Sequence, residues 1–235
     1  MKKALLLFLS FTVCLGCSKK DDASSLFNRD SLTLHANETH QLIENSSDVN
    51  AISSNNFVAS VSASGLVTAN HVGTAKISAG NSVCNVTVEA KYYLYKEPLQ
   101  NWGATKSEIQ AKAGIPHSTT TTSLFYSQSA SVALGYYFEN NKLNGAAVLI
   151  KSASNTSILH FLAERYKLIM EDPDGEIVAM YINANMSDDA TTAVGLSLYP
   201  YDTRYWYVGY IPASQSSKSG RIDMPLDIFK EFLNR

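Results

Sequence analysis

The sequence predicts a mainly β protein of two domains: a β-sandwich, then an α+β domain whose helices cover one face of an antiparallel sheet. Three observations predict this fold class. Residues 26–90 read as short strands separated by turn residues at the spacing of about 8–12 residues that is typical of sandwiches. Residues 91–235 show the order helix, strand, strand, strand twice. Thirteen Tyr and nine Phe among 235 residues favour strands with aromatic faces.

The amino terminus predicts export and a lipid anchor. A short positive region precedes an apolar run, residues 4–13, which is shorter than the about 20 residues that a membrane-spanning helix needs. A small residue, Gly16, comes directly before Cys17, and this resembles the lipobox of bacterial lipoproteins, in which the cysteine is acylated. The resemblance implies a signal peptide over 1–16, palmitate or a similar acyl chain on Cys17, and a tether over 17–25.

The tether also carries information on location. Its Lys-Lys-Asp-Asp core at 19–22 resembles signals that send Gram-negative lipoproteins to the outer face of the outer membrane. The resemblance implies a protein that is lipid-anchored in the outer membrane and exposed at the cell surface, while the choice of leaflet stays open. Cys14 would leave with the signal peptide and Cys17 would be acylated. Cys84 would then be a lone thiol, which we expect in the core.

Residues 53–69 carry a recognisable pattern. They read SSNNFVASVSASGLVTA, and GTAKI follows at 73–77. This pattern resembles the core of bacterial Ig-like domains of group 2, which implies that fold over residues 26–90. The resemblance also implies a stalk or adhesion-type module of surface proteins. A spacer role is favoured over direct binding, since no exposed aromatic cluster is visible in this part of the sequence.

Three residues of this first domain carry separate expectations. Gly65 and Gly73 are expected to supply the backbone conformation of turns. Ile52 stands where that family usually has Trp, which we expect to change the volume of the core but not the topology.

The second domain, residues 91–235, starts with a helix. Thr105 and Glu108 have the spacing of a capping box, and Gly114 would end the helix after Ala113. A second helix is predicted from an apolar stripe that runs from Ile158 to Ile169. The predicted strands are 124–126, 132–139 and 143–150 after the first helix, with a hairpin at Asn140-Asn141, and 176–182, 191–199 and 205–211 after the second. A closing helix is predicted over 225–233.

The repeated order of elements has a parallel in known families. The first helix, the Gly114-Ile115-Pro116 that follows and the hairpin strands resemble a unit of small outer-membrane assembly lipoproteins, which is duplicated in β-lactamase-inhibitor proteins. This resemblance implies an α+β architecture and carries no function across.

Several function classes lack support in the sequence. The net charge of −2 gives no basic surplus for nucleic acid. No nucleotide-binding, zinc-protease or serine-hydrolase motif is present, and the histidines lack metal-ligand spacing. The acidic turn at 171–176 offers oxygen ligands for calcium but lacks the downstream ligands of an EF-hand loop. We therefore expect no enzyme activity, no metal and no cofactor.

An aromatic segment, residues 199–207, is the candidate binding site. Its candidate residues are Tyr201, Tyr205, Trp206 and Tyr207. Strand alternation sends Tyr205 and Tyr207 to one face and Trp206 to the other. Since one face packs under the helices, the other would leave aromatic rings near solvent for sugar rings or a protein. The alternative is that these rings only cover the core.

Together these features predict a surface-anchored lipoprotein with a binding or cell-adhesion role, in which an Ig-like stalk presents an α+β head. Its partners would be the membrane, through Cys17, and a protein or carbohydrate whose class stays open. The alternative is a periplasmic, inhibitor-like or envelope-assembly module that binds another protein.

Overall fold

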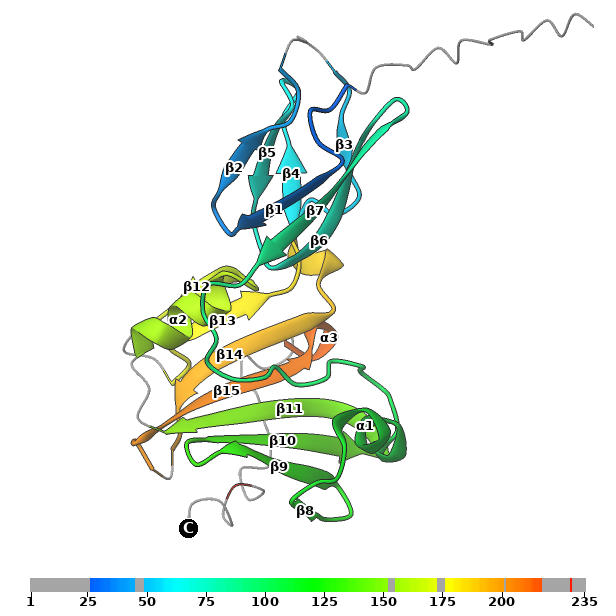
Figure 1. Ribbon diagram of the computed structural model, residues 1–235. Coiled ribbons are helices and arrows are strands. Elements are labelled where there is room, and N and C mark those ends of the chain that lie inside the picture. Colours follow the sequence, from blue (N-terminus) through cyan, green and yellow to red (C-terminus); the bar gives the residue numbers. More distant parts are fainter. Residues whose placement is uncertain are drawn as a thin grey trace, which may run out of the picture.

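The computed structural model describes residues 26–44, 49–151, 155–172, 176–200, 202–216 and 229. These residues form a mainly β protein whose two domains follow one another along the molecule, as the sequence predicts (Figure 1). The predicted signal peptide, Cys17 and the tether lie outside the described residues. So does the predicted closing helix over 225–233, apart from Phe229.

The first domain is a sandwich of two sheets. β1 pairs in parallel with β7, and the other strand pairs are antiparallel. Every second residue of β7 is buried, which directs one row of its side chains between the sheets. The four-stranded sheet has the order β1 (Ser31–His35), β7 (Ser82–Glu89), β6 (Gly73–Ala79), β3 (Ile52–Ser53), and the three-stranded sheet has the order β2 (Thr39–Gln41), β5 (Leu66–Ala69), β4 (Ala59–Val61).

Packing in this domain explains why residue 65 is a glycine, and it accounts for the properties of Cys84. Gly65 has φ +78°, and a Cβ there would lie 2.5 Å from the Cβ of Ile43, so the turn requires glycine. Cys84 is fully buried, as expected, and burial raises the pKa of its thiol. The expectation for Ile52 is wrong: this side chain is 63% exposed on the edge strand β3 and does not change the core volume.

The second domain is built on one antiparallel sheet of eight strands. Each half of the sheet follows one helix in the chain, and the halves meet where β11 pairs with β15. The strand order is β12 (Lys167–Glu171), β13 (Ala179–Ile182), β14 (Thr192–Leu198), β15 (Tyr205–Pro212), β11 (Lys142–Lys151), β10 (Val132–Glu139), β9 (Ser123–Ser129), β8 (Ser118–Thr119).

Two helices, α1 (Lys106–Ala113) and α2 (Asn155–Ala163), cover one face of this sheet (Figure 1). Ile109 of α1 and Phe161 of α2 share a core with Tyr136, Leu134 and Val208 of the strands. The face that these helices leave uncovered is called the opposite face below. Two short helical segments, η1 (Ser187–Asp189) and α3 (Ala213–Ser216), flank β14 and β15.

Local signals in the second domain are confirmed with one exception. Thr105 and Glu108 form the predicted capping box of α1, and the helix ends before Gly114. The hairpin between β10 and β11 turns at Asn140-Asn141, which have φ 49° and 59°, the left-handed values of a two-residue hairpin. The exception is Ile169: α2 ends at Ala163, and Ile169 belongs to the edge strand β12.

Candidate functional site

The aromatic side chains of β15 lie on the predicted faces of the sheet, but Tyr205 and Tyr207 are buried and not exposed as predicted. Tyr205 and Tyr207 share a cluster with Leu149 on the opposite face, whereas Trp206 packs half-buried against the core under the helices. Tyr205 is 4% and Tyr207 5% exposed, so the expectation that they lie near solvent is wrong. Tyr201 lies outside the described residues.

The reason for this burial is a residue that is distant in the chain. Phe229 is 1% exposed and belongs to the same cluster as Tyr205 and Tyr207. It packs edge-to-face against Phe125 and Tyr199, with ring centroids 6.2 and 6.5 Å apart. The rings of the opposite face are therefore covered by the chain itself, and their role in binding stays a prediction.

A polar site with several hydrogen bonds lies where the two domains meet, and it is called the junction below. Its centre is Glu164, which is 6% exposed and comes directly after α2. The carboxylate accepts the backbone N–H groups of Lys91 and Tyr92 at 2.9 and 3.0 Å. Its backbone carbonyl accepts the N–H of Val72, 2.7 Å away in the first domain. Glu164 of the second domain thus binds both the first domain and the segment that connects the two domains, residues 91–104.

Arg165 completes the junction. Its guanidinium donates to Glu164, to the carbonyl of Phe161 at 2.9 Å and to the carbonyl of Tyr92 at 3.1 Å. It also lies 3.2 Å from the carboxylate of Glu97 and 3.8 Å above the ring of Phe161. Its side chain is 11% exposed, and a buried charge with this many partners favours one geometry over others.

A cluster of phenols continues from the junction into the second domain. The Tyr166 hydroxyl donates to Glu97 at 2.5 Å and accepts from Gln100 at 2.6 Å. The hydroxyls of Tyr95 and Tyr210 lie 2.6 Å apart. Burial raises the pKa of Glu97, and it raises the pKa of Tyr95, Tyr166 and Tyr210 well above the ordinary value near 10. These phenols stay protonated at physiological pH and act as neutral hydrogen-bond groups.

The connecting segment, residues 91–104, is fastened along its length to the same face that the helices cover. Gln128 bonds to both the N–H and the carbonyl of Lys96, at 2.8 and 2.7 Å. Further on, Leu99 N–H donates to the Tyr136 hydroxyl and the Trp102 indole donates to Thr192. The segment is therefore an integral layer of the second domain, and it runs across the sheet to α1 (Figure 1).

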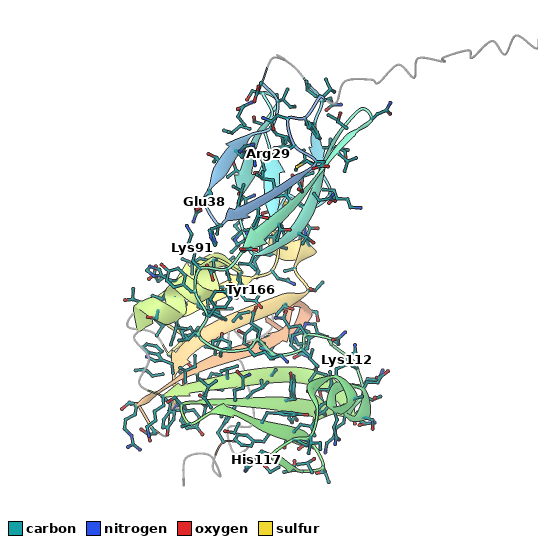
Figure 2. The ribbon with its side chains drawn as sticks, in the orientation of Figure 1. Arg29, Glu38, Lys91, Lys112, His117 and Tyr166 are labelled. Atoms are coloured by element: carbon teal, nitrogen blue, oxygen red, sulfur yellow. The ribbon has the colours of Figure 1, made fainter. Side chains whose placement is uncertain are left out.

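An exposed ion pair adds to the junction from the first domain. Lys91 lies 3.1 Å from Glu38, and both side chains are close to half exposed. Figure 2 shows Glu38, Lys91 and Tyr166 one after another from the first domain into the second. The backbone N–H of His35 donates a hydrogen bond to the Glu38 carboxylate and is the main cause that lowers its pKa. The hydrogen bond from Lys91 lowers it further. Because water screens this pair, we assign it little stability.

This arrangement is suited to fixing the geometry of the junction. The donors of Arg165 and the oxygens of Glu164 are engaged with the chain's own groups. Among the described residues, no group of three or more His, Cys, Asp or Glu side chains could hold a metal ion. No helix in the described part of the chain is long and apolar enough to cross a membrane.

Sequence reasoning missed the junction. The aromatic run at 92–95 is conspicuous, whereas Glu164 and Arg165 fall inside the helix predicted over 158–169 and are not part of its apolar stripe. The local feature that marks them is a pair of adjacent opposite charges directly before a buried Tyr166. That pattern alone does not identify the partners, which lie about 70 residues earlier in the chain.

The described chain starts at the end of the first domain that lies away from the junction. The N–H of Leu26 donates to the hydroxyl of Ser82, at the start of β7. β7 runs from there to Glu89, beside the junction, and its eight residues span about 25 Å at roughly 3.4 Å per residue. The first domain therefore lies between the start of the described chain and the second domain (Figure 1).

Comparison with known families identifies the first domain. Residues 25–90 match the model of the bacterial Ig-like domain, group 2. The first domain is a bacterial Ig-like domain. This domain indicates a surface or adhesion-type role, while the comparison with curated proteins finds no match.

Comparison with solved structures finds only a distant similarity. A cysteine-rich secretory protein from Staphylococcus aureus subsp. aureus Mu50 is similar at 8% identity and a TM-score of 0.29, over 55% of this chain and 51% of that protein. This chain thus covers about half the length of that protein, and the low TM-score leaves the fold of the second domain to be described by its own topology.

Proposed function

We propose that the protein is a surface lipoprotein, anchored through Cys17, whose Ig-like domain is a rigid stalk for a second domain that binds a protein or carbohydrate. The observation that carries this proposal is the junction. The buried Glu164 ties the connecting segment and the Ig-like domain to the second domain through three backbone bonds. A stalk with such a junction holds its head in one orientation.

The position of the amino-terminal end supports the same proposal. Leu26, the first described residue, lies at the end of the Ig-like domain away from the second domain. An anchor on Cys17 would therefore attach to the outer end of the stalk, and the second domain would stand away from the membrane. Acyl chains bind membranes stably when more than one is attached, which is the usual state of lipoprotein cysteines.

The experiment replaces Cys17 by serine and uses Cys14→Ser as the matched control. In cells grown with labelled palmitate, the wild type and Cys14→Ser should carry the label and sediment with membranes. Cys17→Ser should lose both properties. Labelling of Cys17→Ser, or loss of labelling in Cys14→Ser alone, contradicts the assignment of the anchor.

Protease treatment of intact cells separates surface exposure from the periplasmic alternative. The surface proposal predicts that an immunoblot signal from the second domain disappears before the envelope is opened, while a periplasmic control protein survives. Protection of the second domain until the envelope is opened supports instead the inhibitor-like or envelope-assembly role, and a search for envelope partners then replaces a search for external ligands.

A further inference from the structure

One apolar side chain projects from the surface of the second domain. Ile115, in the loop that follows α1, is 93% exposed, more than any other large apolar side chain of the described residues. Its loop is fastened to β9 on both sides. The Tyr126 hydroxyl donates to the carbonyl of Gly114 at 3.1 Å, and the N–H of His117 donates to the carbonyl of Phe125 at 2.7 Å.

The backbone on either side of Ile115 adds to this restraint. Gly114 has φ +90° and donates its N–H to the carbonyl of Gln110, which closes α1. Pro116 follows, and a residue before proline is confined to extended conformations. Ile115 is therefore presented in one position, and a contact made through it loses little conformational entropy.

A hollow lies beside Ile115 on the solvent side of α1. Its volume is about 430 Å³, and it is lined by Ser107, Gln110, Ala111, Gly114 and Ile115 itself. These five residues are exposed, whereas Ile109 of the same helix is buried in the core. Because steps of three and four residues share one helix face, the hollow follows α1 for roughly 12 Å at 1.5 Å per residue, with Ile115 at one end.

A projecting side chain next to a hollow makes a surface self-complementary under a two-fold axis. Ser107 and Ile115 each lie four residues from Ala111. When two copies pack their α1 helices antiparallel with the axis beside Ala111, Ile115 of each copy comes over Ser107 of the other. Each hollow then receives the Ile115 side chain of the other copy at its open end.

The charges of α1 fit the same arrangement. Glu108 and Lys112 are exposed and one turn apart on one flank of the hollow, and Figure 2 shows Lys112 on α1. The two-fold axis keeps this flank on the same side of both copies and reverses the direction of the helix, so Glu108 of each copy faces Lys112 of the other. The Glu108 carboxylate uses Oε2 for its bonds to Thr105, and Oε1 can accept from Lys112. Such exposed pairs add little affinity, but they favour the antiparallel orientation.

The place of α1 in the molecule leaves room for this contact. α1 packs on β9 and β11, in the half of the sheet away from β12 and the Ig-like domain (Figure 1). A contact through α1 therefore keeps both Ig-like domains away from the two-fold axis.

We propose that the second domain binds a second copy of the same chain, through α1 and Ile115 of each copy. This inference rests on the proposed binding role of the second domain, and it names the partner as a protein, the chain itself. One helix and one loop on each side make a contact smaller than a standard interface. A single pair is therefore weak, and many pairs between two coated surfaces act together.

Disulfide cross-linking of the full chain, purified in detergent, tests this contact. Ala111→Cys places a thiol beside the two-fold axis, and Val83→Cys places an exposed thiol on the Ig-like domain. Cys14 and Cys17 are replaced by serine in both, and the buried Cys84 is left in place. Under mild oxidation, Ala111→Cys should form linked dimers roughly tenfold faster than Val83→Cys or more, because the contact raises the local concentration of its thiols.

A second substitution shows whether Ile115 seats the contact. Ile115→Asp, added to Ala111→Cys, should lower the rate to that of Val83→Cys, because pairing would bury an unpaired carboxylate. The matched control is Leu168→Lys, which changes an exposed apolar side chain on β12 and should leave the rate unchanged. If circular dichroism shows that Ile115→Asp is unfolded, Ile115→Ser replaces it and should lower the rate in the same way.

Three results would overturn the proposal. Equal rates for Ala111→Cys and Val83→Cys would leave this face to a different protein. A rate that the substitution of Ile115 does not change would show that Ile115 does not seat the contact, and an equal loss with Leu168→Lys would show that the loss is not specific. Palmitate labelling and surface exposure are measured on chains that keep Cys17, so failure of this inference is distinguishable from failure of the anchor.

Discussion

Glu97 is the residue at which burial and charge act against each other. Burial raises its pKa above the ordinary 4.5, although Tyr166 and Arg165 both lower it. A carboxyl whose pKa is raised in the folded chain favours folding below its unfolded pKa, and this contribution is lost as the pH rises through the raised pKa. The wild type should therefore lose stability between pH 4 and pH 7 for this reason.

Glu97→Gln removes the titrating group and tests this prediction. Urea unfolding of both proteins at pH 4 and pH 7 gives the free energy of unfolding of the wild type minus that of the variant. This difference should be smaller at pH 7 than at pH 4. Trp fluorescence is a suitable signal, because both tryptophans, Trp102 and Trp206, lie in the second domain. The same difference at pH 4 and pH 7 would show that the titration of Glu97 does not affect the free energy of unfolding.

In the Ig-like domain, both the backbone conformation and the packing at residue 65 require glycine. Gly65→Ala places a Cβ 2.5 Å from Ile43 at φ +78°, whereas Gly80, at φ +55°, has open space around it. Gly65→Ala should cost about 2–4 kcal/mol from strain and overpacking together, and Gly80→Ala should cost about 1 kcal/mol. The rate of labelling of the buried Cys84 thiol reports the opening of this domain. Equal labelling rates in the two variants would contradict the packing argument.

At the scale of elements, the capping box of α1 is the contact most open to a simple test. The Thr105 hydroxyl accepts the N–H of Glu108, and the Glu108 carboxylate accepts the N–H of Thr105 at 2.8 Å. Thr105→Ala should lower the free energy of unfolding by about 1 kcal/mol. Gln110→Ala, on the exposed middle of the same helix, should change it by less than about 0.5 kcal/mol. The reverse order of the two variants would contradict the role of the cap.

The elements that could be predicted from sequence are those with local signals. The capping box and Gly114 bound α1, and Asn140-Asn141 mark the hairpin of β10 and β11. The end of α2 had no such signal. Apolar residues continue at helical spacing to Ile169, and no Gly or Pro stops the helix, yet the chain turns at Glu164 because the junction takes its carboxylate and carbonyl.

The candidate site was less predictable for a related reason. Alternation along β15 correctly separates Tyr205 and Tyr207 from Trp206. Whether a sheet face is open depends on what covers it, and the cover of this face comes from Phe229, which is more than 20 residues further along the chain. The same limit applies to Ile52, whose exposure follows from its place on an edge strand.

At the scale of the whole molecule, two of the ion pairs of the junction should contribute differently to the free energy of unfolding. Glu164 and Arg165 are 6% and 11% exposed, whereas Lys91 and Glu38 are 47% and 43% exposed. Glu164→Ala leaves the N–H groups of Lys91 and Tyr92 without their acceptor and takes one of two carboxylates from the buried guanidinium of Arg165. It should cost the second domain about 3 kcal/mol or more. Lys91→Ala should cost less than about 1 kcal/mol. Urea unfolding followed by Trp fluorescence measures both, and similar values would contradict the assignment.

The central claim, a stalk that holds the second domain in one orientation, is tested most directly by a distance between the domains. Spin labels on Val83→Cys and Leu198→Cys, both exposed, report it by pulsed electron resonance. Cys14 and Cys17 are replaced by serine, and the buried Cys84 is left in place. The account predicts one narrow distance distribution for the junction as it stands and for Lys91→Ala, and a broad distribution for Glu164→Ala. A broad distribution in the unaltered junction would contradict the rigid stalk.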